Sequence, residues 1–374
     1  MTKGKLLYAC NADSYYATKL EMGDPYIYLE DKNGKTHGCF SVLEIDRAKA
    51  NAQIDHIHSL ESIIKIIKDE DRVISQSTII KQLLDMTETH DIIVPSDFPA
   101  SLYKSLRDLG INIEIQNVIF PARIIKTPEE IEKIRQAQAI NEEGFKVAFD
   151  ILHDSTIADD EKLIWKDKPL TSEVLRNQMN SVITLAGGIA QAGGPIVAGG
   201  VQGAQPHEHG HGPLYANQLI VIDSYPRHSN LYYGDLTRTV LKGKANKQQE
   251  KLYQSVKTAQ EIGVNMVKTG VVASSIHEAI QAQFDTDGFK TEVDKNGNNV
   301  GFIHSTGHNV GLDVHDVGPG VSKQNNLLET NQVITIEPGL YYSEIGGVRI
   351  EDIVAVTEDG PDNLTTLEKF LEID

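Results

Sequence analysis

Along the first third of the chain, hydrophobic and polar residues form short runs with two kinds of spacing. Wholly apolar or alternating runs predict strands, and runs with apolar residues three or four positions apart predict helices. The predicted strands cover residues 26–29, 39–43, 91–95 and 111–115, and the predicted helices cover residues 78–86 and 100–109. Strands interleaved with helices predict an α/β domain of moderate size.

A helix start marks the boundary of a second domain. In Thr127-Pro128-Glu129-Glu130 the threonine can cap a helix, the proline suits its first position, and the two glutamates favour its N-terminus. We therefore predict an N-terminal α/β domain over residues 1–122 and a second domain over residues 123–374.

The second domain mixes long helices with strands that follow one another. The predicted helices cover residues 128–152, 171–186, 246–268 and 273–284, and the predicted strands cover residues 219–223, 231–241, 332–342 and 347–356. The uncharged stretch 177–207 contains seven glycines, so it predicts a helix end, glycine-rich turns and a short strand rather than a membrane helix. This pattern predicts an α+β fold rather than a doubly wound sheet.

Composition and charge exclude several classes of protein. Of the 374 residues 40% are hydrophobic and 24% are charged, as in an ordinary globular protein. The 35 basic and 53 acidic residues give a net charge of −18, which would repel nucleic-acid phosphates and anionic membranes. Cys10 and Cys39 are the only cysteines, too few for a disulfide framework, and no signal-peptide pattern follows Met1. We expect a cytoplasmic protein that binds neither nucleic acid nor membrane.

Two predicted hairpins carry carboxylates at the ends of apolar strands. The midpoint of Asp223 and Asp235 falls in a polar turn, so we expect these side chains to face each other with Cβ atoms about 5 Å apart. Glu337 and Glu351 are related in the same way about the turn at 343–347. Carboxylates that close repel each other unless a cation lies between them. One such pair of carboxylates would commonly lie on a solvated surface. Two pairs with the same arrangement favour a functional site.

Six of the thirteen histidines lie in two short segments. They are His207, His209 and His211 in the first segment and His304, His308 and His315 in the second. An exposed polar loop that binds adventitious metal is an equally good explanation of the first segment. In the second segment, Gly307 and the flanking β-branched residues argue against a helical zinc motif.

Together these residues resemble the pita-bread metallopeptidases. The resemblance lies, in sequence order, in Asp223, Asp235-Leu236-Thr237-Arg238-Thr239, His304 to His308, His315-Asp316, Glu337-Pro338-Gly339-Leu340 and Val348-Arg349-Ile350-Glu351-Asp352. It covers roughly residues 123–374 and is similar to the Xaa-Pro branch, aminopeptidase P and prolidase. It implies a pita-bread catalytic domain preceded by the family's smaller α/β domain, the creatinase N-terminal domain.

The resemblance also implies roles for individual residues. The implied ligands of two divalent metals are Asp223, Asp235, His308, Glu337 and Glu351. Oxygen-rich coordination favours Mn²⁺, with Co²⁺, Zn²⁺ and Fe²⁺ as alternatives. The other implied site residues are His207 near the nucleophile, His304 at the pocket wall, His315 on the substrate and Arg349 in the pocket lining. Because glycine-rich segments align in more than one way, His209 and His211 stay open as alternatives to His207.

The implied activity is hydrolysis of Xaa-Pro bonds, in a dipeptide or a longer peptide, by a homodimer. A hydroxide shared by the two metals would attack the scissile carbonyl, with Glu337 as both ligand and base. The step from Asp223 to Asp235 is one residue longer than the family's usual spacing, which predicts a bulge or a longer turn.

The same residues admit other interpretations. Creatinase-type relatives share the fold but lack the five ligands. Methionine aminopeptidases share the ligands but usually lack so large an N-terminal domain and an arginine at the position of Arg349. The alternatives that stay open are a catalytically silent binding protein with this fold and a methionine-aminopeptidase-like peptidase of other specificity.

Overall fold

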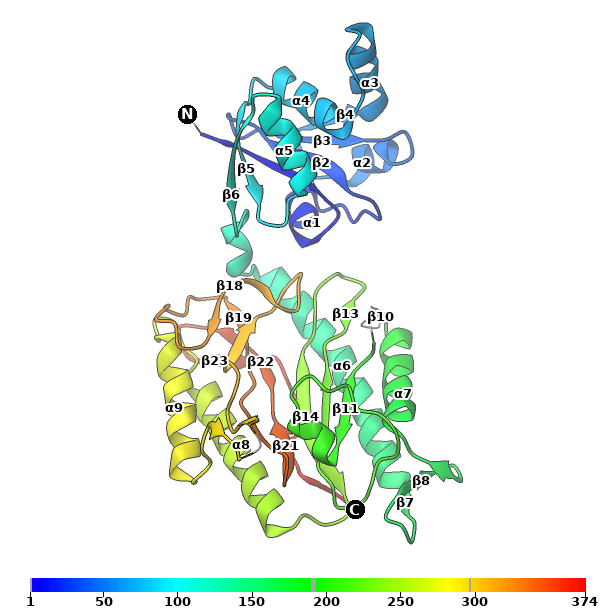
Figure 1. Ribbon diagram of the computed structural model, residues 1–374, viewed down its shortest axis with the longest axis vertical. Coiled ribbons are helices and arrows are strands. Elements are labelled where there is room, and N and C mark those ends of the chain that lie inside the picture. The colour runs from blue at the N-terminus through cyan, green and yellow to red at the C-terminus, as the bar shows by residue number, and fades with distance from the viewer. Residues whose placement is uncertain (1, 190–192, 296) are drawn as a thin grey trace. The chain divides into compact units, whose positions relative to one another are not determined.

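The computed structural model describes residues 2–189, 193–295 and 297–374 (Figure 1). Contacts between residues divide the chain into two compact units, Met1–Pro121 and Ala122–Asp374. Part of the glycine-rich stretch, residues 190–192, lies outside the described residues. Across the described residues, no helix combines the length and apolar character needed to cross a membrane.

The N-terminal unit is a mixed sheet with helices. Its strands are β1 (Gly4–Ala9), β2 (Tyr26–Glu30), β3 (Thr36–Phe40), β4 (His56–Ser59), β5 (Asp91–Pro95) and β6 (Asn112–Gln116), in the order β4-β3-β2-β1-β5-β6. Its helices are α1 (Ala12–Thr18), α2 (Ile45–Asn51), α3 (Leu60–Asp69), α4 (Gln76–Met86) and α5 (Ala100–Asp108). Strand β1 pairs antiparallel with β2 and parallel with β5. The α/β character predicted for this region is confirmed.

One predicted strand of this unit, at 39–43, is displaced. Strand β3 ends at Phe40, and Cys39 pairs with Ile27 of β2. Val42 and Leu43 follow the strand and are 69% and 88% exposed. The prediction failed because two apolar residues in a solvent-exposed turn have the same pattern as the end of a buried strand.

In the C-terminal unit, helices flank curved sheets on both sides (Figure 1). The helices are α6 (Pro128–Asp154), α7 (Ser172–Leu185), α8 (Lys247–Met266) and α9 (Ala273–Thr286), and the 3₁₀ turns are η1 (Pro121–Ile124) and η2 (Gly200–Ala204). The predicted start of α6 is confirmed, since the Thr127 hydroxyl accepts from the Glu130 N–H at 3.2 Å and the Glu130 carboxylate accepts from the Thr127 N–H at 2.9 Å.

Two larger sheets and several short strand pairs complete this unit. The first sheet has the order β11 (Ile196–Gly199), β12 (Ile220–Ser224), β14 (Leu236–Lys242) and β24 (Glu372–Ile373). The second has the order β18 (Asp316–Val321), β17 (Gly307–Asn309), β19 (Val333–Ile336), β22 (Asp352–Val356) and β23 (Pro361–Asn363). The short strands are β7 (Thr156–Ile157), β8 (Leu163–Trp165), β9 (Lys168–Pro169), β10 (Gly188–Ile189), β13 (Arg227–His228), β15 (Glu292–Val293), β16 (Asn299–Val300), β20 (Gly339–Tyr342) and β21 (Gly346–Arg349). The predicted α+β organisation is confirmed.

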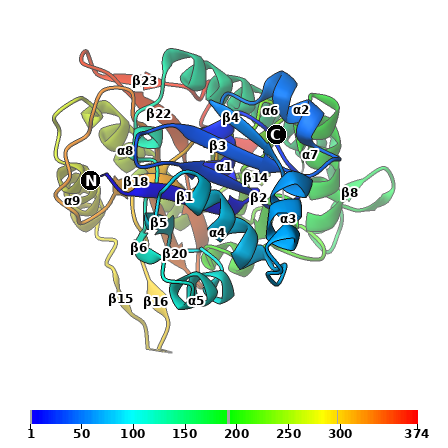
Figure 2. The same cartoon turned by 90° about the horizontal axis from the view of Figure 1, so that it is seen from above.

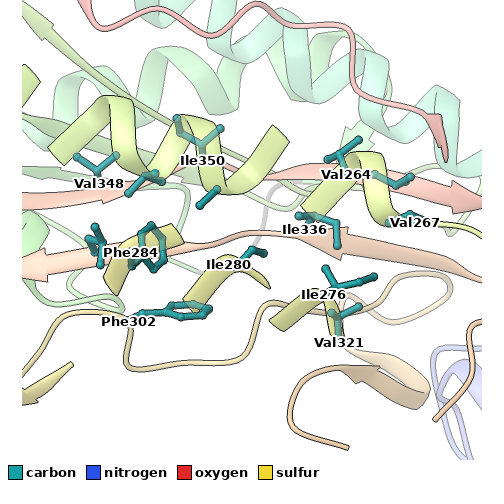
Figure 3. Close-up of a cluster of buried hydrophobic side chains, with 14 of the residues drawn as sticks. Val264, Val267, Ile276, Ile280, Phe284, Phe302, Val321, Ile336, Val348 and Ile350 are labelled. Atoms are coloured by element: carbon teal, nitrogen blue, oxygen red, sulfur yellow. The ribbon is translucent and has the colours of Figure 1, made fainter. Parts of the chain in front are cut away.

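A single apolar cluster joins α8 and α9 to the strands beneath them (Figure 3). Val264 and Ile280 come from the two helices, and Ile336 and Ile350 come from the strand segments that carry the predicted glutamate ligands. Ile280, Ile336 and Ile350 are completely buried. Fully burying such a side chain contributes roughly 1.5 to 3 kcal/mol, so this cluster fixes the segments that flank the glutamates.

The predicted strands at 332–342 and 347–356 are each broken in two. Strands β19 and β20 are separated at Glu337-Pro338, and β21 and β22 at Ile350-Glu351. Proline has no N–H with which to continue a ladder. The N–H of Glu337 instead donates to Thr306 O at 2.8 Å, and that of Glu351 donates to Thr237 O at 3.1 Å. Both glutamates therefore lie where a strand changes its partner.

Candidate active site

The first predicted carboxylate pair is not directly opposed. Asp223 of β12 faces Thr237 of β14, and Asp235 lies just before β14 begins. The prediction of facing aspartates was wrong because the connection is longer than a simple hairpin turn, with Leu231 in the left-handed region at φ 77°. Residues two apart on a strand share a face, so Asp235 and Thr237 still project to the same side as Asp223.

The second pair keeps the predicted register. Ile336 pairs with Asp352 on one side of the break and Gly339 pairs with Arg349 on the other. Glu337 and Glu351 therefore occupy opposed positions in the gap between the two ladders. An isolated bridge connects this gap to the first sheet, because Glu351 pairs with Thr237 and accepts from its hydroxyl at 2.7 Å.

His308 of β17 closes the cluster. Its Nε2 lies 3.5 Å from Asp235 Oδ2 and 3.6 Å from Glu337 Oε1. Asp235, His308 and Glu351 each offer an atom within 4.8 Å of the others, a spacing that can hold a metal ion. Asp223 lies in the same cavity, which has a volume of about 650 Å³ and is lined by all five predicted ligands.

Burial and mutual repulsion disfavour the charged carboxylates. Burial, followed by the charges of Glu351 and Asp223, raises the pKa of Asp235 well above its ordinary value. Burial raises the pKa of Glu351 well above its ordinary value, as does the charge of Glu337. Burial raises the pKa of Glu337 to about 7, with the Asp223 charge adding to the rise and Arg349 opposing it. A cation among them would relieve this penalty.

The donor set fits divalent metal ions. Asp223 Oδ1 is buried, and no described residue gives it a hydrogen-bond partner. Burial, with the neighbouring His315, lowers the pKa of His308 to about 4, so its imidazole is neutral and can donate a lone pair. Carboxylate oxygens with one imidazole suit a hard divalent ion better than a soft one.

The other predicted site residues line the same cavity. Arg349 is buried, and its Nη2 lies 2.5 Å from Asp223 Oδ2 while its Nη1 donates to Tyr341 Oη at 2.8 Å. His304 Nε2 lies 3.0 Å from the same Tyr341 oxygen. The ring of His315 lies 4.3 Å from that of His308.

The histidines of the first segment line two different cavities. His207 and His209 line the cavity with the carboxylates. His211 lines a different cavity, together with Gln202 and Tyr215. This placement leaves His207 and His209 as the alternatives near the predicted ligands.

Sequence reasoning missed Tyr341 and Tyr225. Tyr341 connects Arg349 to His304, and Tyr225 lines the cavity beside Asp223. A tyrosine in an apolar strand has the same pattern as a core residue. The one signal in the sequence was strand alternation, because Tyr341 lies two positions from Gly339 and therefore on the same face of the strand. Burial raises the pKa of Tyr341 to about 12, so its hydroxyl stays protonated.

These pKa shifts predict that the stabilising effect of metal grows with pH. A carboxyl such as Glu337, with a pKa near 7 in the folded protein and 4.5 ordinarily, binds its proton more tightly when folded. Its contribution to stability is present at low pH and is lost as the pH rises through that interval. We expect the rise in Tm caused by saturating Mn²⁺ over chelator to be larger at about pH 7.5 than at about pH 5. Thermal unfolding followed by circular dichroism measures this, and an equal rise at both values would contradict it.

Comparisons with known proteins agree with this geometry. The model of metallopeptidase family M24 matches residues 132–358. The Xaa-Pro dipeptidase of Pyrococcus furiosus is 33% identical over 261 residues, which are 69% of this chain and 68% of that protein. A protein named putative Xaa-Pro aminopeptidase in Mycoplasma genitalium is 34% identical over 241 residues, 63% of this chain and 61% of that protein.

Solved structures share the fold over nearly the whole chain. The prolidase of Pyrococcus horikoshii superposes with a TM-score of 0.81 at 24% identity, covering 99% of this chain and 95% of that one. The X-Pro aminopeptidase of Thermotoga maritima gives a TM-score of 0.80 at 22% identity, covering 99% and 97%. The predicted pita-bread fold and the resemblance to the Xaa-Pro branch are confirmed. The chain belongs to metallopeptidase family M24.

Proposed function

We propose that this protein hydrolyses Xaa-Pro peptide bonds and that it holds two divalent metals for this purpose. The proposed ligands are Asp223, Asp235, His308, Glu337 and Glu351, and the proposed metal is Mn²⁺, with Co²⁺, Zn²⁺ or Fe²⁺ as substitutes. The observation that carries the proposal is the convergence of these five side chains on one cavity of about 650 Å³. Relatives named for Xaa-Pro hydrolysis support the choice of bond.

Glu337 is the proposed proton carrier. When bound, the metals supply Lewis-acid polarisation and an activated water. The Glu337 carboxylate takes a proton from the attacking water and delivers it to the proline nitrogen, which leaves as a neutral amine because an amide anion is too basic to depart. As a proposed ligand, Glu337 lies beside the attacking water, where its carboxylate can both accept and release a proton.

The remaining polar residues position the substrate. His304 is fixed by Tyr341 on one ring nitrogen and by Ser305 O, at 2.7 Å, on the other. We propose that His304 and His315 orient the substrate and that His207 stabilises the oxyanion. Arg349 fixes Asp223, so its role is to hold a ligand in place as well as to line the pocket.

The cavity also offers apolar surface for a proline ring. Ile196, Tyr225 and Val314 line it beside the polar residues. A rigid ring lacking an N–H packs on such a wall without leaving an unpaired donor. We infer that proline is selected by this fit.

The experiment that tests the function is removal and return of metal. Dialysis against a chelator is expected to abolish cleavage of Ala-Pro, and Mn²⁺ is expected to restore it, because the carboxylate cluster cannot activate water alone. Ala-Ala is the control for proline selection, and a peptide beginning with methionine tests the alternative specificity. Stoichiometric metal without turnover of any of these peptides would favour the silent binding protein instead.

We further propose a cytoplasmic homodimer, in which the N-terminal unit corresponds to the family's smaller domain. The two cysteines, one exposed and one buried, support a reducing compartment. Size-exclusion chromatography with light scattering of the metal-loaded protein measures the oligomeric state.

A further inference from the structure

Two buried amide side chains of α6 bond to the main chain beside the proposed aspartate ligands. Helices α6 and α7 lie together on one side of the sheets of the C-terminal unit, and α8 and α9 lie on the other side (Figure 2). Gln138 and Asn141 are three positions apart, on one face of α6, and both are completely buried. A buried amide costs free energy unless it is hydrogen-bonded. The partners of these amides therefore show what this face of α6 holds.

Gln138 connects the two sheets that adjoin the proposed ligands. Its Oε1 accepts from the Asp235 N–H at 2.9 Å, and its Nε2 donates to Thr365 Oγ1 at 2.8 Å. The same Thr365 oxygen accepts from the Ile353 N–H of β22 at 3.0 Å, two residues after Glu351. Asp235 precedes the ladder between β12 and β14, so the Gln138 oxygen takes the place of a strand partner for its N–H. One side chain thus holds the main chain at Asp235 and, through Thr365, near Glu351.

The main chain at Gly234 lies directly against α6. An added Cβ at Gly234 would lie 2.6 Å from Ala137 O and 3.0 Å from Gln138 Cα, so only glycine lets the chain come this near to the helix. The Gly234 N–H donates to Pro226 O at 3.0 Å, which closes the connection between β12 and β14. Asp235 therefore approaches β14 in direct contact with Gln138.

Asn141 makes a similar contact beside the other aspartate. Its Nδ2 donates to Ser224 O at 2.5 Å, and Ser224 directly follows Asp223. Asn141 Oδ1 is buried, and no described residue gives it a hydrogen-bond partner. Helix α6 thus contacts the main chain at both proposed aspartate ligands, and Gln138 is the residue of the two whose amide is bonded at both ends.

We propose that Gln138 is a positioning residue that keeps Asp235 and Glu351 close enough to share a metal ion. The inference rests on the proposed function, in which both are ligands. Atoms of these two carboxylates lie within 4.8 Å of each other, together with one from His308. When charged, the carboxylates repel each other, and the hydrogen bonds of Gln138 oppose their separation because they hold the main chain on both sides. Less of the site then has to be ordered when metal binds.

Mn²⁺ titration of the full chain after removal of metal tests this. Gln138→Met keeps the length of the side chain and removes the amide. We expect it to raise the Kd for Mn²⁺ about tenfold, measured by isothermal titration calorimetry, because the main chain at Asp235 is no longer held. Without its acceptor, the Asp235 N–H should also exchange faster in the metal-free variant, measured by hydrogen-exchange mass spectrometry of peptides that contain this residue.

Gln249→Met is the matched control. Gln249 is a buried glutamine of α8 whose amide likewise accepts one bond, from the Asn246 N–H at 2.8 Å, and donates another, to Asn217 O at 2.9 Å. It lines the cavity of His211 rather than that of the five proposed ligands. We expect Gln249→Met to lower Tm, because a buried hydrogen-bonded amide is lost, and to leave the Kd for Mn²⁺ unchanged.

Thr365→Val is a second variant that decides the matter even if Gln138→Met does not fold. It removes the hydroxyl between Gln138 and the Ile353 N–H, so the Kd for Mn²⁺ should again rise, and in the double variant the two effects should be less than additive. A wild-type Kd in either folded variant, or the same rise in Gln249→Met as in Gln138→Met, would overturn the inference and leave the proposed function standing. Wild-type protein that binds no Mn²⁺ would overturn the proposed function and the inference with it.

Discussion

Asp235→Asn is expected to lower kcat/KM for Ala-Pro by about a thousandfold, because losing one proposed ligand removes several kcal/mol of transition-state stabilisation. The amide has the size of the carboxylate but no charge. Since burial and neighbouring charges disfavour ionised Asp235, the metal-free variant is expected to be at least as stable as metal-free wild type. Activity with Mn²⁺, bound metal by mass spectrometry and Tm by circular dichroism measure the three quantities.

Asp159→Asn makes the same change at an exposed aspartate of the same unit. It should leave activity, metal content and Tm as they are. Wild-type turnover by Asp235→Asn would remove this residue from the proposed site, and a large fall in its metal-free Tm would show that the lost activity reflects misfolding.

Arg238→Met is expected to lower the free energy of unfolding by about 3 to 5 kcal/mol, the cost of breaking a buried ion pair from one side. Arg238 is 1% exposed, and its Nη2 donates to Asp352 Oδ1 at 2.9 Å. Its Nη1 donates to Glu351 O at 2.7 Å and to Thr237 O at 2.9 Å. Burial acts to raise the pKa of Asp352. The cationic neighbours Arg238 and then Lys369 outweigh burial and hold this pKa below its ordinary value.

Because Arg238 holds the main chain of a proposed ligand, its loss should also weaken Mn²⁺ binding. Arg135→Met is the control, since Arg135 pairs with Asp362 at 2.9 Å with both side chains at least 40% exposed. An exposed pair contributes about 1 kcal/mol or less. Urea unfolding of both variants gives the comparison, and equal losses of stability would contradict a special role for Arg238.

Local signals along the chain predicted most of the secondary structure. The cap at Thr127 and the apolar spacing of the four long helices depend only on neighbouring residues, and the structure has these helices within one or two residues of their predicted ends. The metallopeptidase resemblance likewise depended on short motifs, each of at most five consecutive residues. Such features can be read locally because the physical cause lies within a few positions.

What the sequence could not predict depends on contacts between distant segments. The register at Asp223 is set by a connection that includes β13, which pairs with β10 some forty positions earlier. The bridge from Thr237 to Glu351 and the salt bridge from Arg238 to Asp352 each span more than 110 positions. A groove beside His304 is lined by four separate segments, so no single run of residues predicts it.

The breaks in the two glutamate strands have a consequence for metal uptake. The main-chain amides of Glu337 and Glu351 are each held by a segment outside their own hairpin. Opening the cluster would therefore require three segments to separate together, and amide hydrogen exchange at these positions should need cooperative opening rather than local fraying. Because the side chains of such a preorganised site are already in place, little conformational entropy is lost when metal binds. Tight binding therefore needs no refolding step.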